Sequence, residues 1–276
     1  MKLRVVELLL VTTVPTMVLA EGGWPSIQLM AITLIGGTLA AGGANAINMY
    51  IDRDIDKLMV RTQNRPLVTG ALTPRAAMIF AIALEIVAFL VVWAGANLLA
   101  AVLAVSATLF YVFVYSLWLK RTSKQNIVIG GAAGAMPVLV GWAAVTNSLG
   151  WEPVVLFIVI FLWTPPHFWA LAIRHADDYK AAGVPMMPVV VSLERTVRSM
   201  TLYAVLLTLS TLVLVPVAEL GWIYGITALV FGVAFVIGSA RLGSDPSPKR
   251  SMRLFTFSIT YVTAVFVALT VDVLLR

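Results

Sequence analysis

"IQLMAITLIGGTLAAGGANAINMY", residues 27–50, is the stretch that decides how this chain folds. It carries no charged side chain, and as a helix it is long enough to cross a hydrocarbon core, which takes about 20 residues. The whole chain shares this character, since 61% of its 276 residues are hydrophobic, 12% are charged, and the mean hydropathy is +0.97. An ordinary water-soluble domain carries about twice that share of charge. The sequence therefore predicts an all-α polytopic membrane protein.

Further apolar runs lie on both sides of this one, and together they predict nine transmembrane helices in a single membrane domain over residues 1–276. The predicted spans are 5–20, 27–50, 75–94, 98–118, 126–146, 153–173, 196–218, 221–240 and 253–275. The alternating ten-residue segments typical of an outer-membrane barrel do not occur in the sequence. The first run, with Lys2 and Arg4 before it, resembles a secretion signal. Because Glu7 interrupts that run, a retained first span is the favoured interpretation.

The basic residues gather on one side of this arrangement, here called the basic face. The basic face comprises residues 1–4, 51–74, 119–125, 174–195 and 241–252, with Arg75, Arg198 and Arg253 at the helix ends. It holds 18 of the 19 Lys and Arg residues. Because Lys and Arg are enriched in cytoplasmic loops, we expect a cell-membrane protein with its amino terminus in the cytoplasm and its carboxyl terminus on the opposite side. A positive charge distributed in this way reports topology, so nucleic acid is not an expected partner.

The composition also limits the chemistry. The chain has no cysteine, so disulfides and thiolate metal sites are excluded. Its two histidines, His167 and His175, cannot form a multi-histidine metal centre within one chain. Glycine and alanine gather in GGTLAAGGANA (36–46) and GGAAGA (130–135). Such residues let helices approach closely in lipid, which is the favoured interpretation. The alternative is that they leave room for a bulky ligand.

The charged residues that follow the second span form a pattern. Asn48, Asp52 and Asp56, here called the first acidic group, are spaced at i, i+4 and i+8, which places them on one face of a helix, whereas Asp54 projects elsewhere. Carboxylates stacked in this way repel each other, and a divalent cation bound between them would make the net electrostatic interaction favourable. Magnesium takes hard oxygen ligands and often combines one or two carboxylates with substrate phosphates. The competing interpretation is a helix end whose aspartates pair locally, for example with Lys57.

A second acidic group, Asp177 and Asp178, follows the sixth span. Facing the first group across a cavity, it would complete a site for magnesium and a diphosphate. Basic residues suited to clamp the phosphate oxygens lie nearby. The candidates for this clamp are Arg61, Arg65, Lys120, Arg121 and Lys180. Lys120 and Arg121 serve equally well as a topological anchor after the fourth span, and the sequence leaves these two roles open.

At this point the motifs resemble a known family. The pattern N48-x3-D52-x3-D56, followed by RTQNRP (61–66), is similar to the first aspartate motif of the UbiA-type intramembrane prenyltransferases. The segment YSLWLKRTSKQN (115–126) is similar to their Tyr/Lys/Arg segment after the fourth helix. Together with NMYIDRDIDKLM (48–59), the segments TPPHFWALAIRHADDY (164–179) and AAGVPMMPVV (181–190) most resemble the branch that farnesylates haem B.

The resemblance implies nine helices around a central cavity, Mg²⁺, farnesyl diphosphate as donor and haem B as acceptor, with haem O as product. It implies catalytic roles for Asn48, Asp52, Asp56, Asp177 and Asp178, with Asn48, Asp52, Asp56 and Asp178 on the metal. It places Arg4, Arg61, Arg65, Lys120, Arg121 and Lys180 on the diphosphate. A haem A synthase or an oxidase assembly protein is a possible partner. One departure is Arg174, which occupies the first position of the second motif and leaves the number of magnesium ions open.

The histidines and the acceptor remain open alternatives. His167 is either an ordinary hydrogen-bonded helix residue or an axial haem ligand, and His175 is the second candidate for ligation or a diphosphate contact. Nothing in residue spacing selects haem over a quinone or chlorophyll precursor. Outside the enzyme class, a transporter of phosphorylated anions is the main alternative and a structural haem-handling protein the weaker one. Glu85 is costly inside the third span, and the sequence assigns it no role.

Overall fold

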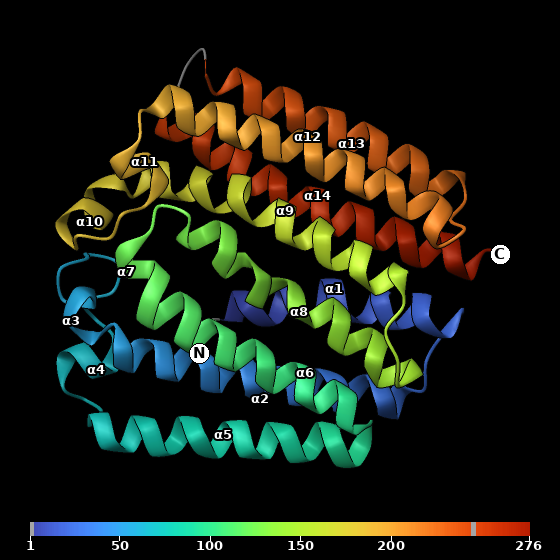
Figure 1. Cartoon of the computed structure of the whole chain (residues 1–276), viewed down its shortest axis with the longest axis horizontal. Coiled ribbons are helices and arrows are strands. Elements are labelled where there is room, and N and C mark those ends of the chain that lie inside the picture. The colour runs from blue at the N-terminus through green and yellow to red at the C-terminus, as the bar shows by residue number, and fades with distance from the viewer. Residues whose placement is uncertain (1–2, 244–246) are drawn as a thin grey trace.

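The computed structural model describes residues 3–243 and 247–276, with side chains from residue 11 onward within these ranges. Its regular structure is helical throughout (Figure 1). The long helices are α1 (Leu3–Glu21), α2 (Ile27–Ile51), α5 (Pro74–Gly95), α6 (Leu98–Leu109), α8 (Asn126–Thr146), α9 (Trp151–Arg174), α12 (Leu193–Val217), α13 (Trp222–Arg241) and α14 (Pro248–Leu274). The short ones are α3 (Arg53–Asp56), α4 (Pro66–Thr69), α7 (Lys120–Thr122), α10 (Ala176–Ala181) and α11 (Met187–Val190), with η1 (Phe110–Leu119), a π-helix, between α6 and α7.

The prediction of an all-helical polytopic membrane protein is confirmed. Eight helices among the described residues are long and apolar enough to cross a membrane, and each lies within a few residues of a predicted span. The fourth of the predicted spans is longer than expected, because α6, η1 and α7 run on without a break over Leu98–Thr122. Helix α1 occupies the position predicted for the first span. The count of nine spans stays a prediction.

Ordinary capping chemistry sets the helix boundaries. Ser26, Thr73, Asn97, Ser192 and Ser247 each accept a hydrogen bond from a backbone N–H in the first turn of the helix that follows. A cap of this kind satisfies one of the N–H groups that a helix start leaves without a partner. These five helices therefore begin at polar residues that sit outside the apolar runs, which helps hydropathy to locate them.

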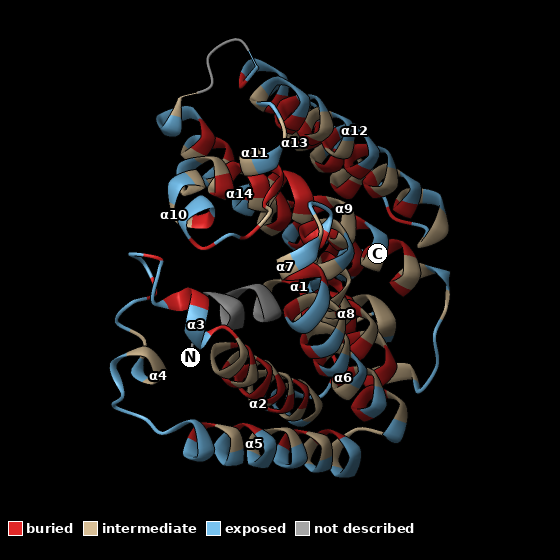
Figure 2. Cartoon of the chain, turned by 60° about the vertical axis from the view of Figure 1, so that its left-hand side comes forward, coloured by how far each residue is buried: buried red, intermediate tan, exposed pale blue. Residues whose placement is uncertain are grey.

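The helices form a bundle with an apolar outside and a tightly packed inside. One large core joins α1, α8, α9, α12, α13 and α14, and a smaller one joins α5, α6 and α8. Buried residues lie on the inward sides of the helices and exposed residues on the outward sides (Figure 2). Helix α2 packs against α5 through small residues: a Cβ added to Gly43 would lie 2.6 Å from Glu85 Oε1 and 3.0 Å from the Ala81 carbonyl oxygen.

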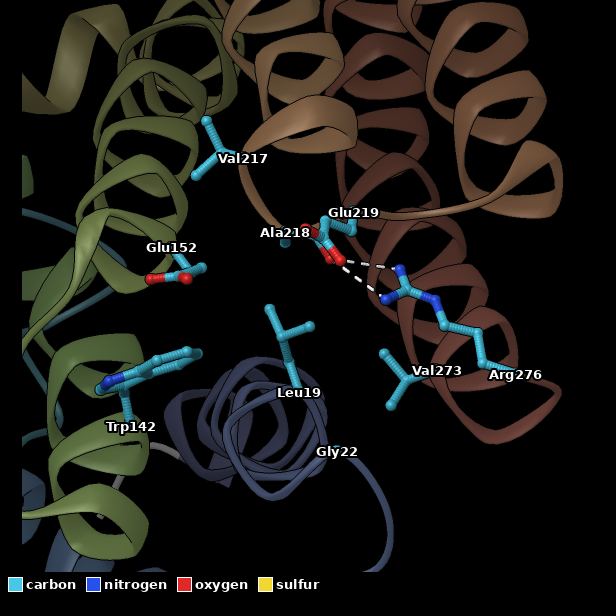
Figure 3. Close-up of a pocket in the computed structure, with 9 residues that line it drawn as sticks. All are labelled: Leu19, Gly22, Trp142, Glu152, Val217, Ala218, Glu219, Val273 and Arg276. Atoms are coloured by element: carbon cyan, nitrogen blue, oxygen red, sulfur yellow. Dashed lines mark hydrogen bonds between the residues drawn. The ribbon is translucent and has the colours of Figure 1, made fainter.

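The short helices α3, α4, α10 and α11 lie together at one end of the bundle, which is the basic face (left in Figure 1). A third apolar cluster lies there, and it connects α3 with the segment around α10. At the opposite end, the buried carboxylate of Asp272 accepts hydrogen bonds from the Gly221 and Tyr224 backbone at the start of α13. Arg276 donates to the Ala218 carbonyl oxygen over 3.2 Å beside a small hollow (Figure 3).

Candidate active site

A cavity of about 830 Å³ extends into the bundle from the basic face. This volume is in the range of pockets that hold cofactors and drug-sized ligands. Its polar end is lined by Asn48, Asp56, Arg61, Arg65 and Lys120. The rest of its wall is mainly apolar and is rich in the glycines and alanines of α2 and α8. The small residues therefore open a space, in addition to letting helices pack.

The first acidic group lies on one face, as its spacing predicts. Asn48 and Asp56 line the polar end of the cavity, and Asp52, which is not in the wall, is paired with the wall residue Lys120. Asn48, Asp52 and Asp56 are 4%, 0% and 1% exposed, whereas the side chain of Asp54 is 60% exposed. Helix α2 ends at Ile51, but the Asp52 N–H donates to the Asn48 carbonyl over 2.9 Å and the Asp56 N–H donates to the Asp52 carbonyl over 2.8 Å. The i, i+4 register therefore continues through the short helix α3.

Each buried carboxylate is paired with a cation from elsewhere in the chain. Lys120 forms an ion pair with Asp52 Oδ2, and Arg65 Nη1 lies 2.5 Å from Asp56 Oδ2. Asn48 Nδ2 also donates to Asp52 Oδ2, over 2.8 Å. The local pairs expected from a plain helix end do not account for the Asp52 contact, because Lys120 comes from α7 and lies 68 residues along the chain, whereas Arg65 lies nine residues after Asp56. Two buried negative charges are thus compensated before any ligand binds.

Arg121, next to Lys120, points to a different partner. Its guanidinium binds the carboxylate of Asp54 through two contacts of 2.7 Å. The hydrogen bonds from Arg121 lower the pKa of Asp54 to about 2. Arg121 Nη2 is also 3.9 Å from Asp52 Oδ1, but Arg121 is not part of the cavity wall. The two residues for which the sequence left the role open therefore differ in position: Lys120 lines the cavity and Arg121 holds the exposed Asp54.

The residues of the first acidic group fit a magnesium ion. Asp52 Oδ1 and Asp56 Oδ1 are buried and have no hydrogen-bond partner. Leaving such an oxygen without a partner is costly, and a hard divalent cation is the kind of ligand that offsets the cost. No three acidic, histidine or cysteine side chains come together within the described residues. Two carboxylates, the Asn48 amide oxygen and phosphate oxygens of a substrate are the donor set that this arrangement offers to Mg²⁺.

The second acidic group has a different environment. Asp177 is exposed, Asp178 is half-buried with one oxygen 3.8 Å from His175 Nδ1, and Lys180 is exposed. None of the three belongs to the cavity wall. The same short helix reaches the cavity through Tyr179, which is 1% exposed and lies 4.9 Å beneath the guanidinium of Arg61. The metal and diphosphate roles expected of Asp177, Asp178 and Lys180 stay predictions. The side chain of Arg4 lies outside the described residues, so its expected diphosphate contact also stays a prediction.

The two histidines occupy different places. His167 lines the cavity, stacked between the rings of Trp163 and Phe255 with centroid distances of 4.1 and 4.5 Å. His175 is the residue that ends α9, and it is not in the cavity wall. Burial lowers the pKa of His175, and the nearby charge of Arg61 lowers it further. The structure thus distinguishes the two histidines by position: His167 lines the cavity and His175 does not, which composition alone could not show.

Several cavity residues carried no strong signal in the sequence. Tyr111 and Tyr115 line the cavity as a stacked pair with centroids 5.3 Å apart, and both come from the π-helix η1. Ser116, from the same helix, accepts a hydrogen bond from Asn48 Nδ2 over 3.0 Å. Tyr115 and Ser116 belong to the segment YSLWLKRTSKQN, which the resemblance singled out, but a π-helix has no clear mark in hydropathy. Ser258, which bonds His167, had no signal at all.

The cavity has a charged end and a mainly apolar wall, and it lies within a membrane-protein fold. Comparisons with known proteins define the class. Residues 9–264 match the UbiA prenyltransferase family, and the chain belongs to that family. It is 54% identical over 280 residues to a protein of Frankia casuarinae named protoheme IX farnesyltransferase, a match covering 99% of this chain and 96% of that protein. It is 53% identical to the protein of the same name from Frankia alni, covering 98% and 95%.

Solved structures show the same fold. The structure described as digeranylgeranylglyceryl phosphate synthase superposes with a TM-score of 0.81 at 18% identity, covering 99% of this chain and 95% of that one. A UbiA homologue from Archaeoglobus fulgidus, bound to DMAPP and Mg²⁺, gives a TM-score of 0.68 at 20% identity, covering 98% of each chain. At such identities the likeness concerns the fold. The chain is therefore a polytopic prenyltransferase with a UbiA-like helical fold.

Proposed function

We propose that this prenyltransferase transfers the farnesyl group of farnesyl diphosphate to a vinyl group of haem B to form haem O. In this reaction the bond between farnesyl C1 and the diphosphate oxygen breaks and a carbon–carbon bond forms at the vinyl group. The oxygen of water adds to the other vinyl carbon, and diphosphate and one proton leave. The observation that carries the proposal is the near-full-length identity of 54% and 53% to proteins named for farnesyl transfer to protohaem IX. The cavity supports it independently.

The polar end of the cavity supports binding of the diphosphate. Asp52 and Asp56, with Asn48, would hold magnesium through their free oxygens, and Asp178 would add a ligand from the second acidic group. When bound, the ion supplies Lewis-acid neutralisation of the leaving group. Lys120 and Arg65 each use part of their donors on carboxylates. Because an ammonium has three N–H donors and a guanidinium five, the remaining donors are available to phosphate oxygens.

The other basic residues expected on the diphosphate are assigned according to their place. Arg61 lines the cavity over Tyr179 and joins Lys120 and Arg65 in the clamp. Arg121 acts indirectly, because it fixes the α3 segment through Asp54. Lys180, on the exposed side of α10, and Arg4 would approach the diphosphate from the aqueous side. This division predicts a large loss of transferase activity when Arg61, Arg65 or Lys120 is replaced. It predicts a small loss when Arg121, Lys180 or Arg4 is replaced.

The apolar part of the cavity supports transfer of a prenyl group. Burying a prenyl chain contributes about 0.8 kcal/mol per CH₂ group removed from water. The same wall keeps water from the allylic cation until carbon–carbon bond formation. The stacked rings of Tyr111 and Tyr115 present aromatic faces in the cavity, and such faces attract cations. These residues bind, orient and exclude water, which is what a reaction with a reactive carbocation requires.

The charge distribution supports an orientation in which the basic face is cytoplasmic and the carboxyl terminus lies on the opposite side of the cell membrane. Both proposed substrates would then enter from the inner leaflet or the cytoplasm. The resemblance to the haem-farnesylating branch also implies contact with a haem A synthase or an oxidase assembly protein. Labelling single cysteines introduced at exposed Lys57 and exposed Trp222 with an impermeant thiol reagent in intact cells tests this orientation, because the natural chain has no cysteine.

A membrane assay with haem B, farnesyl diphosphate and Mg²⁺ tests the proposed reaction. We expect a product heavier than haem B by one farnesyl group plus one hydroxyl group, and its loss when a chelator removes Mg²⁺. Supplying a quinone precursor or a chlorophyll precursor in place of haem serves as the matched control. Prenylation of one of those acceptors, with none of haem, would contradict the proposal. Uptake of a phosphorylated anion without release of diphosphate would support the transporter alternative instead.

A further inference from the structure

His167 is held in one fixed orientation at the cavity wall. Its ring is sandwiched by Trp163 from its own helix and by Phe255 from α14. The Trp163 indole N–H donates to the Ser258 carbonyl oxygen over 2.8 Å, which ties the same two helices together. Both faces of the imidazole are thereby covered, and its chemistry is restricted to the ring edge.

The hydrogen bonds of Ser258 determine which nitrogen of His167 carries the proton. Ser258 Oγ lies 2.6 Å from the Phe255 carbonyl oxygen and 2.6 Å from His167 Nδ1. A carbonyl oxygen only accepts, so the single hydroxyl proton of Ser258 is used on Phe255. Ser258 Oγ must then accept from His167, which places the proton on Nδ1. The neutral imidazole therefore carries its lone pair on Nε2.

This lone pair has no protein partner within the described residues, since Nδ1 is the only ring nitrogen of His167 that takes part in a hydrogen bond there. His167 lies in the wall of the large cavity. An imidazole whose Nδ1–H is held by a protein oxygen, with Nε2 free, has the arrangement typical of a metal-ligating histidine. The second oxygen in this relay, Phe255 O, anchors the Ser258 hydroxyl in turn.

The surroundings limit which metal this can be. No cluster of three acidic, histidine or cysteine side chains occurs among the described residues, so a free ion would find too few ligands from the protein at His167. A metal that brings its own equatorial ligands needs one axial donor only. We propose that His167 Nε2 is the axial ligand of the iron of a porphyrin bound in the cavity. This inference rests on the proposed function, in which haem B is the acceptor.

The same observations select between the two histidines. His175 sits at the end of α9, outside the cavity wall, with Nδ1 3.8 Å from Asp178. His167 lies eight residues earlier, about 12 Å along the helix at 1.5 Å per residue. A ligand at that depth anchors the porphyrin among the small residues of the cavity, apart from the magnesium end. Ser258 is a positioning residue in this scheme, because it orients the ligand without touching the porphyrin.

Haem binding to the purified full-length chain, without farnesyl diphosphate, tests the inference. Haem is titrated into detergent-solubilised protein, and the reduced complex is examined for an iron–histidine stretching band by resonance Raman spectroscopy. We expect the band in the wild-type chain and in His175→Ala, and its loss in His167→Ala. Free imidazole should restore a nitrogen-ligated absorption spectrum to His167→Ala. For Ser258→Ala we expect a shifted band and an affinity for haem weakened ~10-fold or more.

Two outcomes would overturn the inference: the same band in His167→Ala as in the wild-type chain, or a band that disappears in His175→Ala instead. If His167→Ala does not fold, His167→Gln, which retains a hydrogen-bonding side chain but not the ligating ring nitrogen, gives the same comparison. The transferase assay is run in parallel on the wild-type chain. Haem ligation by His167 without farnesyl transfer would contradict the proposed function alone, whereas transfer without the iron–histidine band would contradict the ligation alone.

Discussion

The two acidic groups of this chain look alike in sequence and differ completely in environment. In the first, Asp52 and Asp56 are both buried, and Asp56 lines the polar end of the cavity. Asp52 is paired with Lys120 of the distant helix α7, and Asp56 with Arg65, nine residues along the chain. In the second, Asp177 is exposed and Asp178 lies beside His175. Two carboxylates that stay charged inside a membrane protein must be compensated. The first group is therefore buried and compensated by cations, as the proposed metal site requires. The second lies at a solvated edge, and its helix α10 reaches the cavity wall through Tyr179.

The largest expected effect tests this difference directly. Asp56→Asn removes a negative charge with a free oxygen while nearly preserving shape, so magnesium loses a ligand and the leaving group loses part of its neutralisation. We expect kcat/KM to fall by ~10³-fold or more, about 4 kcal/mol of transition-state stabilisation. The matched change Asp177→Asn alters an exposed carboxylate, and we expect it to stay within about threefold of wild type. Steady-state kinetics at several Mg²⁺ concentrations measure both variants.

A loss in Asp177→Asn as deep as that in Asp56→Asn would break the comparison. It would mean that α10 moves on substrate binding and brings Asp177, in addition to the proposed ligand Asp178, to the diphosphate site. Measuring the apparent affinity for Mg²⁺ sharpens the test, because a lost ligand raises the Mg²⁺ requirement whereas a folding defect lowers the amount of active enzyme at every Mg²⁺ concentration.

The helical membrane fold could be predicted from the sequence because each segment that crosses the lipid is a long run of apolar residues. A chain that must satisfy its backbone inside a membrane forms long apolar helices, and hydropathy located them within a few residues. The shared face of Asn48, Asp52 and Asp56 was equally predictable, because helical periodicity fixes it. Their partners were not, since the pairing of Asp52 with Lys120 depends on how η1 and α7 pack beside α2. The π-helix and the Ser258 relay also depend on tertiary packing, which leaves no periodic signal.

The second prediction compares the two neighbouring cations of α7. Lys120→Met leaves Asp52 as a buried charge without its main partner, and removing one partner of a buried pair costs about 3–5 kcal/mol. Because the Lys120 side chain lines the cavity and is 11% exposed, we expect a smaller loss, about 2–3 kcal/mol in the free energy of unfolding. Arg121→Met breaks an exposed pair with Asp54 and should cost less than ~1 kcal/mol. Chemical denaturation in detergent measures both, and equal losses would contradict the contrast between buried and exposed pairs.

The third prediction concerns the part of the second region that does reach the cavity. Tyr179→Leu removes the ring beneath the Arg61 guanidinium, and a partly desolvated cation–π contact contributes about 1–2 kcal/mol. Since Arg61 would bind the diphosphate, we expect KM for farnesyl diphosphate to rise about 5–30-fold with a smaller change in kcat. The control Tyr179→Phe retains the aromatic face and should stay close to wild type. An unchanged KM in Tyr179→Leu would show that Arg61 needs no support from α10.

The smallest expected effect is the acid dependence of the exposed pair between Asp54 and Arg121. The folded-state pKa of Asp54 is lowered to about 2 by Arg121, against about 3.9 for an unperturbed aspartate. A lowered folded pKa stabilises the fold above the unfolded pKa, and this contribution is lost as the pH falls through the folded pKa. The difference in Tm between the wild-type chain and Asp54→Asn should therefore be constant above ~pH 5 and vanish near pH 2.

Screening at an exposed site limits the difference in the free energy of unfolding to less than ~1 kcal/mol, and added salt should reduce it further. The buried carboxylates of Asp52 and Asp56 are present in both proteins, so the comparison isolates the contribution of Asp54. If the Tm of the wild-type chain instead starts below that of Asp54→Asn and rises toward it as the pH falls, the first acidic group repels Asp54 more strongly than Arg121 attracts it.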